Sequence, residues 1–369
     1  MPLSAVDCIQ PAIQHTKEQL FTRFRWGQWT RLALVGILAG EMHASGCNIG
    51  NFNFNLPTTQ KSGDDFLAIP SFPHIDPARI AQFAGLIALV LFAMLILFFV
   101  FLYLNSIFRF ILFDSVLQRE CSIGKGWQRW SHAGRRFFLW QLVFQIVVIL
   151  FLAVLVGIPV LLAISAGWMK NPEQHVGGML GGVLLLFLVL GVCALAAFIV
   201  QVLARDFLVP IMALEDLDFA DGWSRLFSLM RGEVGKYAIY ILLKLVLTIA
   251  AAILFGIIAI IPTLIVAIPS VVIFLAAKAA GLGWTVATVS LAVIFGTIAF
   301  LVLVYLIALT SVPATVFFPA YAMYFFASRY PNLNALLNPA PPEPVLPPVV
   351  EAPLPESPPP LPPTPEPIG

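Results

Sequence analysis

Long stretches without a charged side chain are the feature that most constrains how this chain of 369 residues can fold. Asp, Glu, Lys and Arg are absent from five runs of 29 to 50 residues, which cover 80–108, 137–169, 174–204, 245–277 and 279–328. A transmembrane helix needs about 20 consecutive apolar residues. Apolar types make up 60% of the chain, against roughly 45–50% in soluble domains, so a soluble core cannot bury them all. The sequence therefore predicts an all-α, polytopic helical membrane bundle.

Each of the five runs holds one predicted span. These spans lie near 83–104, 140–163, 181–202, 237–261 and 285–309. Proline interrupts the apolar pattern in the later runs because it has no backbone N–H to donate. Pro262 and Pro269 predict that residues 263–280 form a separate re-entrant or interfacial piece. Pro313 and Pro319 are expected to break the chain after the last span.

A sixth, short span is predicted at residues 27–45, where the apolar stretch LALVGILAG is flanked by Arg31 and Glu41. The alternative is a helix that lies in the membrane interface. The positive-inside rule favours a crossing, because it leaves only four of the 20 Lys and Arg on the outer side: Lys61, Arg79, Lys170 and Lys278. We therefore expect about six spans in the cell (inner) membrane, with both termini cytoplasmic. Seven spans, counting 263–280, are the competing arrangement.

The predicted organisation has five parts. A cytoplasmic amphipathic segment (1–26) precedes the short first span (27–45), and an irregular exterior loop rich in Asn, Gly and Pro follows (46–78). The helical membrane bundle covers 79–330. Residues 331–369 hold 16 of the 29 prolines and no Lys or Arg, which predicts a disordered tail of polyproline II character. This composition favours an extended spacer of little specificity, and the PxxP spacings leave a protein partner for the tail as the alternative.

Two cytoplasmic loops that lie 96 residues apart resemble each other and indicate an internal repeat. Arg109 aligns with Arg205, and the Gly–Trp pair at 126–127 aligns with the pair at 222–223. The two repeat units are placed near 83–166 and 179–262.

Each of these loops is predicted to contain an amphipathic helix that lies on the cytoplasmic leaflet and leads into the next span. Apolar residues recur at the same helical spacing from Ile123 and from Phe219. Tryptophan suits the membrane interface, and arginine can meet lipid phosphates. The predicted partners are therefore membrane lipids, anionic lipids in particular. The candidate lipid-headgroup or interface residues are Arg109, Trp127, Arg129, Arg135, Arg136, Arg205, Trp223, Arg225 and Arg231.

The same stretches resemble a known family. FDSVL, GKGWQRW and RRFF in the first loop, and DFLVP and GWSRLFSLMRG in the second, are similar to the membrane domain attached to some glycerophosphodiester phosphodiesterases. They are more similar still to the uncharacterised prokaryotic multi-span proteins related to that domain. The N-terminal QHTKEQLFTRFRWGQWTRLALVGILAG resembles the first segment of the same set, so the resemblance covers about 10–330. It implies a fold and not a reaction, because no phosphodiesterase catalytic domain accompanies it.

Ionisable residues are scarce in the predicted spans. Lys244 is expected to reach back to the cytoplasmic face, and Arg205 with Asp206 to form an ion pair that fixes a helix end. Glu41 and His43 end the first span and are expected near the outer surface. No HExxH, GxSxG or paired-carboxylate motif occurs in the spans, and the four cysteines form no CxxC pair. The sequence thus predicts no catalytic site, no metal and no cofactor.

These observations favour a non-enzymatic integral membrane protein that acts as a lipid-associated scaffold or organises the membrane. The alternative is a transporter or lipid-moving protein, and a third possibility is an enzyme acting on lipid headgroups. The lack of ionisable groups near the middle of the spans argues against ion-coupled transport. A net charge of +1 argues against a broad basic surface for nucleic acid.

Overall fold

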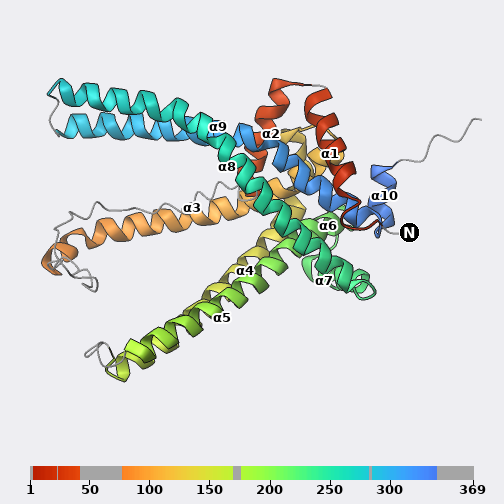
Figure 1. Cartoon of the computed structure of the whole chain (residues 1–369), viewed down its shortest axis with the longest axis horizontal. Helices are drawn as coiled ribbons and strands as arrows, with labels where there is room; N and C mark the ends of the chain where they lie inside the picture. Colours follow the sequence, from red (N-terminus) through yellow and green to blue (C-terminus); the bar gives the residue numbers. More distant parts are fainter. Residues whose placement is uncertain (1–2, 23, 42–76, 169–175, 282–284, 339–369) are drawn as a thin grey trace, which may run out of the picture.

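The structure, a computed structural model, describes residues 3–22, 24–41, 77–168, 176–281 and 285–338 (Figure 1). All regular elements in these residues are helical. In chain order they are α1 (Ile9–Lys17), the π-helical turn η1 (Glu18–Thr22), α2 (Trp26–Leu38), α3 (Pro77–Leu117), α4 (Ile123–Ser165), α5 (Val176–Leu203), the π-helical turn η4 (Ala204–Leu208), α6 (Val209–Glu215), α7 (Phe219–Met230), α8 (Val234–Ala279), α9 (Val286–Ala327) and α10 (Pro331–Leu337). The predicted exterior loop lies outside the described residues, except for its last two residues, which begin α3.

Five helices in the described residues are long and apolar enough to cross a membrane. They are α3, α4, the continuous helix of α5, η4 and α6, then α8 and α9. At 1.5 Å per residue, the 43 residues of α4 and the 46 of α8 extend over about 65 and 69 Å. The hydrocarbon core of a bilayer is about 30 Å thick, so roughly half of each helix lies beyond it. The all-α fold with several membrane-spanning helices is therefore confirmed.

Two predicted breaks are absent from the long helices. α8 continues through Pro262 and Pro269, and α9 continues through Pro313 and Pro319. The prediction of a separate piece at 263–280 is therefore wrong. Proline removes one hydrogen bond from a helix, but ending the helix inside hydrocarbon would leave several backbone groups without partners. A long apolar helix consequently continues through proline where a soluble helix would often end.

The long helices meet in one compact region and diverge from it (Figure 1). We call this region the hub: it consists of α1, α2, α6, α7 and α10 with the adjoining ends of the five long helices. The remaining parts of the long helices are the legs. Figure 1 shows α3, the pair α4 and α5, and the pair α8 and α9 leaving the hub in different directions. Large buried side chains such as Phe110, Phe207 and Phe325 gather in the hub, whereas the most apolar window of each long helix is 0 to 11% buried. The hydrophobic core therefore lies in the hub and not between the legs.

Both predicted amphipathic segments are helical, and residues of their apolar faces pack inside the hub. Trp130 of α4 and Leu226 of α7 are buried. Gly134 allows α4 to approach α3 closely, because a Cβ at this position would lie 2.6 Å from the side chain of Ile107. The prediction that the apolar face lies on the leaflet is therefore wrong for the first segment, which is covered by neighbouring helices of the same chain. In the second segment Phe219 and Val234 are exposed, so for this face the placement on the leaflet stays a prediction.

The helix at the predicted first span, α2, lies antiparallel along the hub end of α3. Near its start, Gln28 Nε2 donates to the carbonyl of Arg119 at 2.9 Å, and at its end the carbonyl of Ala39 accepts from Arg109 at 2.9 Å. Gly36 in between packs directly against Thr315 of α9. With 13 residues, α2 is shorter than the about 20 that a crossing needs. α2 therefore belongs to the hub, and a sixth crossing is not found in the described residues.

The first residues of the predicted disordered tail form a helix. Pro331 begins α10, a position that suits proline because the first helical N–H needs no partner within the helix. Leu333 is completely buried, and the preceding Tyr330 donates its hydroxyl hydrogen to Glu215 of α6 at 2.6 Å. The prediction of disorder is therefore wrong for α10. The other 15 of the 16 prolines that suggested it lie beyond 338, outside the described residues.

Candidate functional site

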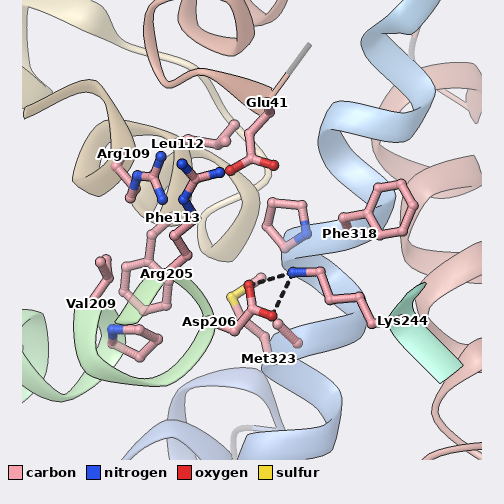
Figure 2. Close-up of a pocket in the computed structure, with 13 residues that line it drawn as sticks. Glu41, Arg109, Leu112, Phe113, Arg205, Asp206, Val209, Lys244, Phe318 and Met323 are labelled. Atoms are coloured by element: carbon pink, nitrogen blue, oxygen red, sulfur yellow. Dashed lines mark hydrogen bonds and ion pairs between the residues drawn. The ribbon is translucent and has the colours of Figure 1, made fainter. Parts of the chain in front are cut away.

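A small pocket lies beyond the end of α2, lined by residues of α3, η4, α6, α8 and α9 (Figure 2). Its open volume is about 30 Å³, which accommodates roughly two water-sized groups. Apolar side chains such as Phe113 and Met323 form part of its wall. Five ionisable residues from four separate parts of the sequence line it together: Glu41, Arg109, Arg205, Asp206 and Lys244.

Asp206 has strong hydrogen-bond partners. Lys244 of α8 donates to both carboxylate oxygens, with Nζ 2.7 Å from Oδ1. Tyr240, four residues earlier and therefore on the same face of α8, donates its hydroxyl hydrogen to Oδ2 at 2.8 Å. The side chains of Asp206 and Lys244 are only 8% and 13% exposed, and a buried pair persists only when its polar atoms are well partnered. The pair joins η4 to α8 and neutralises both charges.

The wide turn of η4 places Arg205 and Asp206 in the same pocket although they are adjacent in sequence. Pro210 follows four residues after Asp206 and has no N–H to donate to its carbonyl. Wide π-helical turns form where the regular hydrogen-bond pattern of a helix is disturbed, and they are frequent at functional sites. The sequence thus produces a local change in helix geometry at the point where two charged residues meet the pocket.

Arg109 is held in place by the end of α2. Its Nη2 donates to the carbonyl of Ala39 at 2.9 Å and to Asn105 Oδ1 at 3.2 Å. Gly40 has a φ of +72°, the left-handed conformation that glycine adopts readily at the end of a helix. A Cβ at Gly40 would come within 2.5 Å of Asn105, so this turn needs glycine for space as well as for conformation.

The turn at Gly40 brings Glu41 to the two arginines. Figure 2 shows the guanidinium groups of Arg109 and Arg205 side by side, with the carboxylate of Glu41 turned toward them. The prediction that Glu41 lies near the outer surface, across the membrane from these arginines, is therefore wrong. It depended on a crossing by α2, and α2 is too short to make one. His43, predicted to accompany Glu41, lies outside the described residues.

The two arginines retain hydrogen-bond donors without partners in the part of the chain that the structure describes. Arg109 is 4% exposed, and the Nε atoms of both Arg109 and Arg205 are buried and unpartnered there. Because Lys244 neutralises Asp206, Glu41 is the one remaining carboxylate among the described lining residues. The pocket therefore carries one positive charge in excess, in a partly buried setting where charge acts more strongly than in water.

Only two of the nine predicted headgroup or interface residues line this pocket, Arg109 and Arg205. Three other arginines form ion pairs in the hub: Arg129 with Asp114, Arg136 with Asp216 and Asp218, and Arg225 with Glu215. Arg135 and Arg231 are exposed on the hub surface. The tryptophans pack against other rings, Trp127 on Tyr103 and Phe108, and Trp223 on Trp140 and Phe227.

Sequence reasoning did not identify Lys244, Asp206 and Glu41 as members of one site with the arginines. A usable signal was present, because Arg109, Arg205 and Lys244 each border a charge-free run at its predicted cytoplasmic end. Residues that end apolar helices on one side of a membrane lie at a similar depth. What the pattern could not show is which of them face one another.

A metal ion in the pocket would require a grouping of ligand side chains in its lining. Within the described residues, no three His, Cys, Asp or Glu side chains lie close enough to hold a metal ion. Cys8, Cys121 and Cys193 are free thiols, and Cys47 lies outside the described part of the chain. Burial raises the pKa of the Cys8 thiol to about 11, so it stays protonated at neutral pH. What the pocket does offer is hydrogen-bond donation and positive charge from two guanidinium groups.

A hub with a buried core, joined to five long apolar helices, defines a multi-pass helical membrane protein. A family model matches residues 3–336, and the chain belongs to that family, the family of unknown function DUF7544. The matched region includes the hub, the legs and all residues of the pocket. Comparisons with curated proteins and with solved structures returned no match.

Proposed function

We propose that this protein is a non-enzymatic, lipid-associated scaffold of the cell membrane, with its hub on the cytoplasmic side and its legs in the bilayer. The divergence of the legs supports this most directly, because helices with so few buried residues offer their apolar surface to lipid on nearly all sides. Among the described Lys and Arg residues, only Arg79 and Lys278 belong to the far ends of the legs. This distribution supports a cytoplasmic hub by the positive-inside rule.

The sequence resemblance to the membrane domain of glycerophosphodiester phosphodiesterases belongs to the same proposal. Membership of DUF7544 carries no reaction with it, and the resemblance concerns a membrane domain without its catalytic partner. Both are compatible with a protein whose task is to hold lipid or another protein at the membrane. A partner for the proline-rich tail stays a prediction, because that segment lies outside the described residues.

Lipid contact around a whole leg is testable with a photoactivatable lipid. Phe92 and Met94 of α3 are 63% and 65% exposed and point about 200° apart around the helix axis. A diazirine lipid in native membranes is expected to crosslink to both positions. Phe110 and Ile111 on the same helix are buried in the hub and serve as controls that should remain unlabelled. Labelling of only one of Phe92 and Met94 would indicate a closed bundle and contradict the proposal.

A lipid-moving protein is the second candidate, and one observation favours it. The charged pocket lies in the hub, close to where the apolar legs begin, so that a polar headgroup would find a partner beside an open apolar surface. Proteoliposomes with a fluorescent phospholipid test this: dithionite reduces only lipid in the outer leaflet. If dithionite removes a larger share of the fluorescence from proteoliposomes than from protein-free vesicles, lipid has moved from the inner to the outer leaflet. This result would support lipid movement and contradict a purely static scaffold.

A further inference from the structure

We propose, on the basis of the lipid association proposed above, that the pocket formed by Arg109, Arg205 and Lys244 binds a phosphate group, with two of its oxygens seated between the two guanidinium groups. The chemistry is that of a phosphodiester or phosphate anion. A lipid headgroup and free inorganic phosphate share this chemistry, and the experiment below separates them.

The charge of the pocket matches such a ligand. Arg109 and Arg205 lie side by side, and two cations in a partly buried cavity repel each other unless an anion lies between them. Glu41 offsets one of these charges, and Lys244 is occupied by Asp206. One positive charge is left, and a phosphodiester carries one negative charge.

The hydrogen-bond donors of the pocket also match. The Nε atoms of Arg109 and Arg205 are buried and have no partner among the described residues, which is costly for a charged donor. A guanidinium group presents its N–H groups in a planar fork that fits two oxygens of one phosphate. The open volume of about 30 Å³ holds roughly two water-sized oxygens, so the pocket accepts the end of a phosphate and leaves its ester side outside.

The position of the pocket along the helices places it at the level of lipid headgroups. On α3, Arg109 follows Phe101, the last large exposed apolar residue of that leg, by eight residues, or about 12 Å. On α8, exposed apolar residues lie on both sides of Lys244, with Leu242 and Val246 each two residues away, so Lys244 lies where the apolar surface of this helix is still exposed. The headgroup region extends several ångströms beyond the hydrocarbon core on each side. A phosphate in the cytoplasmic leaflet therefore lies at about the depth of the pocket.

The predicted repeat gives the two arginines equivalent places in the chain. Arg109 and Arg205 are aligned in the two similar loops, and the fold brings both to one pocket rather than to two. The arginines at other positions in these loops are paired with carboxylates or lie on the surface. The pocket therefore has a donor pair that the rest of the basic hub lacks.

The test is a titration of the purified full-length protein with dioleoylphosphatidylglycerol, followed by native mass spectrometry. Arg205→Gln removes a guanidinium group whose Nε atom has no hydrogen-bond partner in the described residues, so the protein should still fold. Arg231→Gln is the matched control, because Arg231 is an exposed arginine on the hub surface. We expect Arg205→Gln to weaken binding of the first lipid about tenfold, the loss of one strong charge-assisted hydrogen-bonded contact, and Arg231→Gln to leave it unchanged. Arg205→Lys, which keeps the charge and loses the fork, should fall between them.

Equal lipid affinity in the wild type and in folded Arg205→Gln would overturn the pocket and leave the proposed lipid association intact. A wild-type protein that retains no lipid at all would instead contradict the proposed function. A second arm adds inorganic phosphate alone and measures the melting temperature. A rise that Arg205→Gln abolishes identifies free phosphate as the ligand, whereas no rise, together with Arg205-dependent lipid binding, identifies the lipid headgroup.

Discussion

The ammonium group of Lys244 in α8 lies 2.7 Å from the carboxylate of Asp206 in η4, and both side chains are buried at the junction of the hub and the legs. The contact joins two of the long helices across 38 residues of sequence. With side chains only 13% and 8% exposed, Lys244 and Asp206 have little contact with water, so each depends on the other for compensation of its charge.

Removing one member of this pair is expected to be costly. Asp206→Asn leaves a buried ammonium group opposite a neutral amide and should lower the free energy of unfolding by about 3–5 kcal/mol. Reversible unfolding in detergent measures the effect. Lys244→Met should be comparably destabilising, and the double variant should lose less than the sum of the two single losses. Strict additivity of the two losses would show that the residues do not stabilise the fold as a pair.

The close approach of α3 and α4 gives a second prediction. At Gly134 an added Cβ would lie 2.6 Å from the Ile107 side chain and 3.0 Å from its Cα, so the helices must separate to accept it. Gly134→Ala should destabilise the protein by about 1–3 kcal/mol. Gly157→Ala is the control on the same helix, since nothing lies within 4 Å there, and it should be neutral or stabilising by up to about 1 kcal/mol. Melting temperatures of the two variants that move together would refute this account of the interface.

His15 predicts a pH dependence of the N-terminal segment. Its Nε2 lies 3.0 Å from the carbonyl of Val116, which can only accept, so Nε2 carries the hydrogen and Nδ1 accepts from the Tyr324 hydroxyl. Burial, with Arg119 adding to the effect, lowers the pKa of His15 below its usual value of about 6.5. The folded state therefore binds the proton less readily than the unfolded state, so stability is present above pH 6.5 and declines as the pH falls below it.

Hydrogen exchange of the α1 amides measures this effect. As the pH is lowered from 6.5 to 5, the exchange of these amides, corrected for its intrinsic pH dependence, should become faster. The His15→Gln variant should lose most of the change. A variant at the exposed His132 should keep it. Protection of α1 that stays constant over this range would contradict the assignment.

The side of the membrane on which the hub lies can be read from cysteine accessibility. In a background without native cysteines, Ser165→Cys marks the far end of α4 and Ser228→Cys marks α7 in the hub, both at exposed positions. An impermeant maleimide should label Ser165→Cys in intact cells and label Ser228→Cys only after the membrane is opened. The reverse pattern would place the hub outside.

The sequence located the membrane-crossing helices well because hydropathy is a local property: each of the five long helices contains the greater part of one charge-free run. It failed at Pro262 and Pro269, where the cost of exposed backbone groups in hydrocarbon outweighs the loss of a hydrogen bond. It also failed at Glu41, because the position of this residue depends on the packing of Gly36 against Thr315, which is 279 residues away in the chain. The same difference between local sequence properties and non-local packing applies to the site. Arg109 and Arg205 were identified from their repeated setting, whereas their meeting with Lys244 and Asp206 depends on non-local packing.

The divergence of the legs is the central claim, and a distance measurement between spin labels in lipid nanodiscs tests it most directly. One label pair at Leu195 and Val246 marks α5 and α8 near the hub, and a second pair at Leu180 and Phe274 marks the same helices near their far ends; all four residues are exposed. Divergent legs predict a longer distance between Leu180 and Phe274 than between Leu195 and Val246 (Figure 1). An equal or shorter distance between the far labels would show a closed bundle and contradict the account.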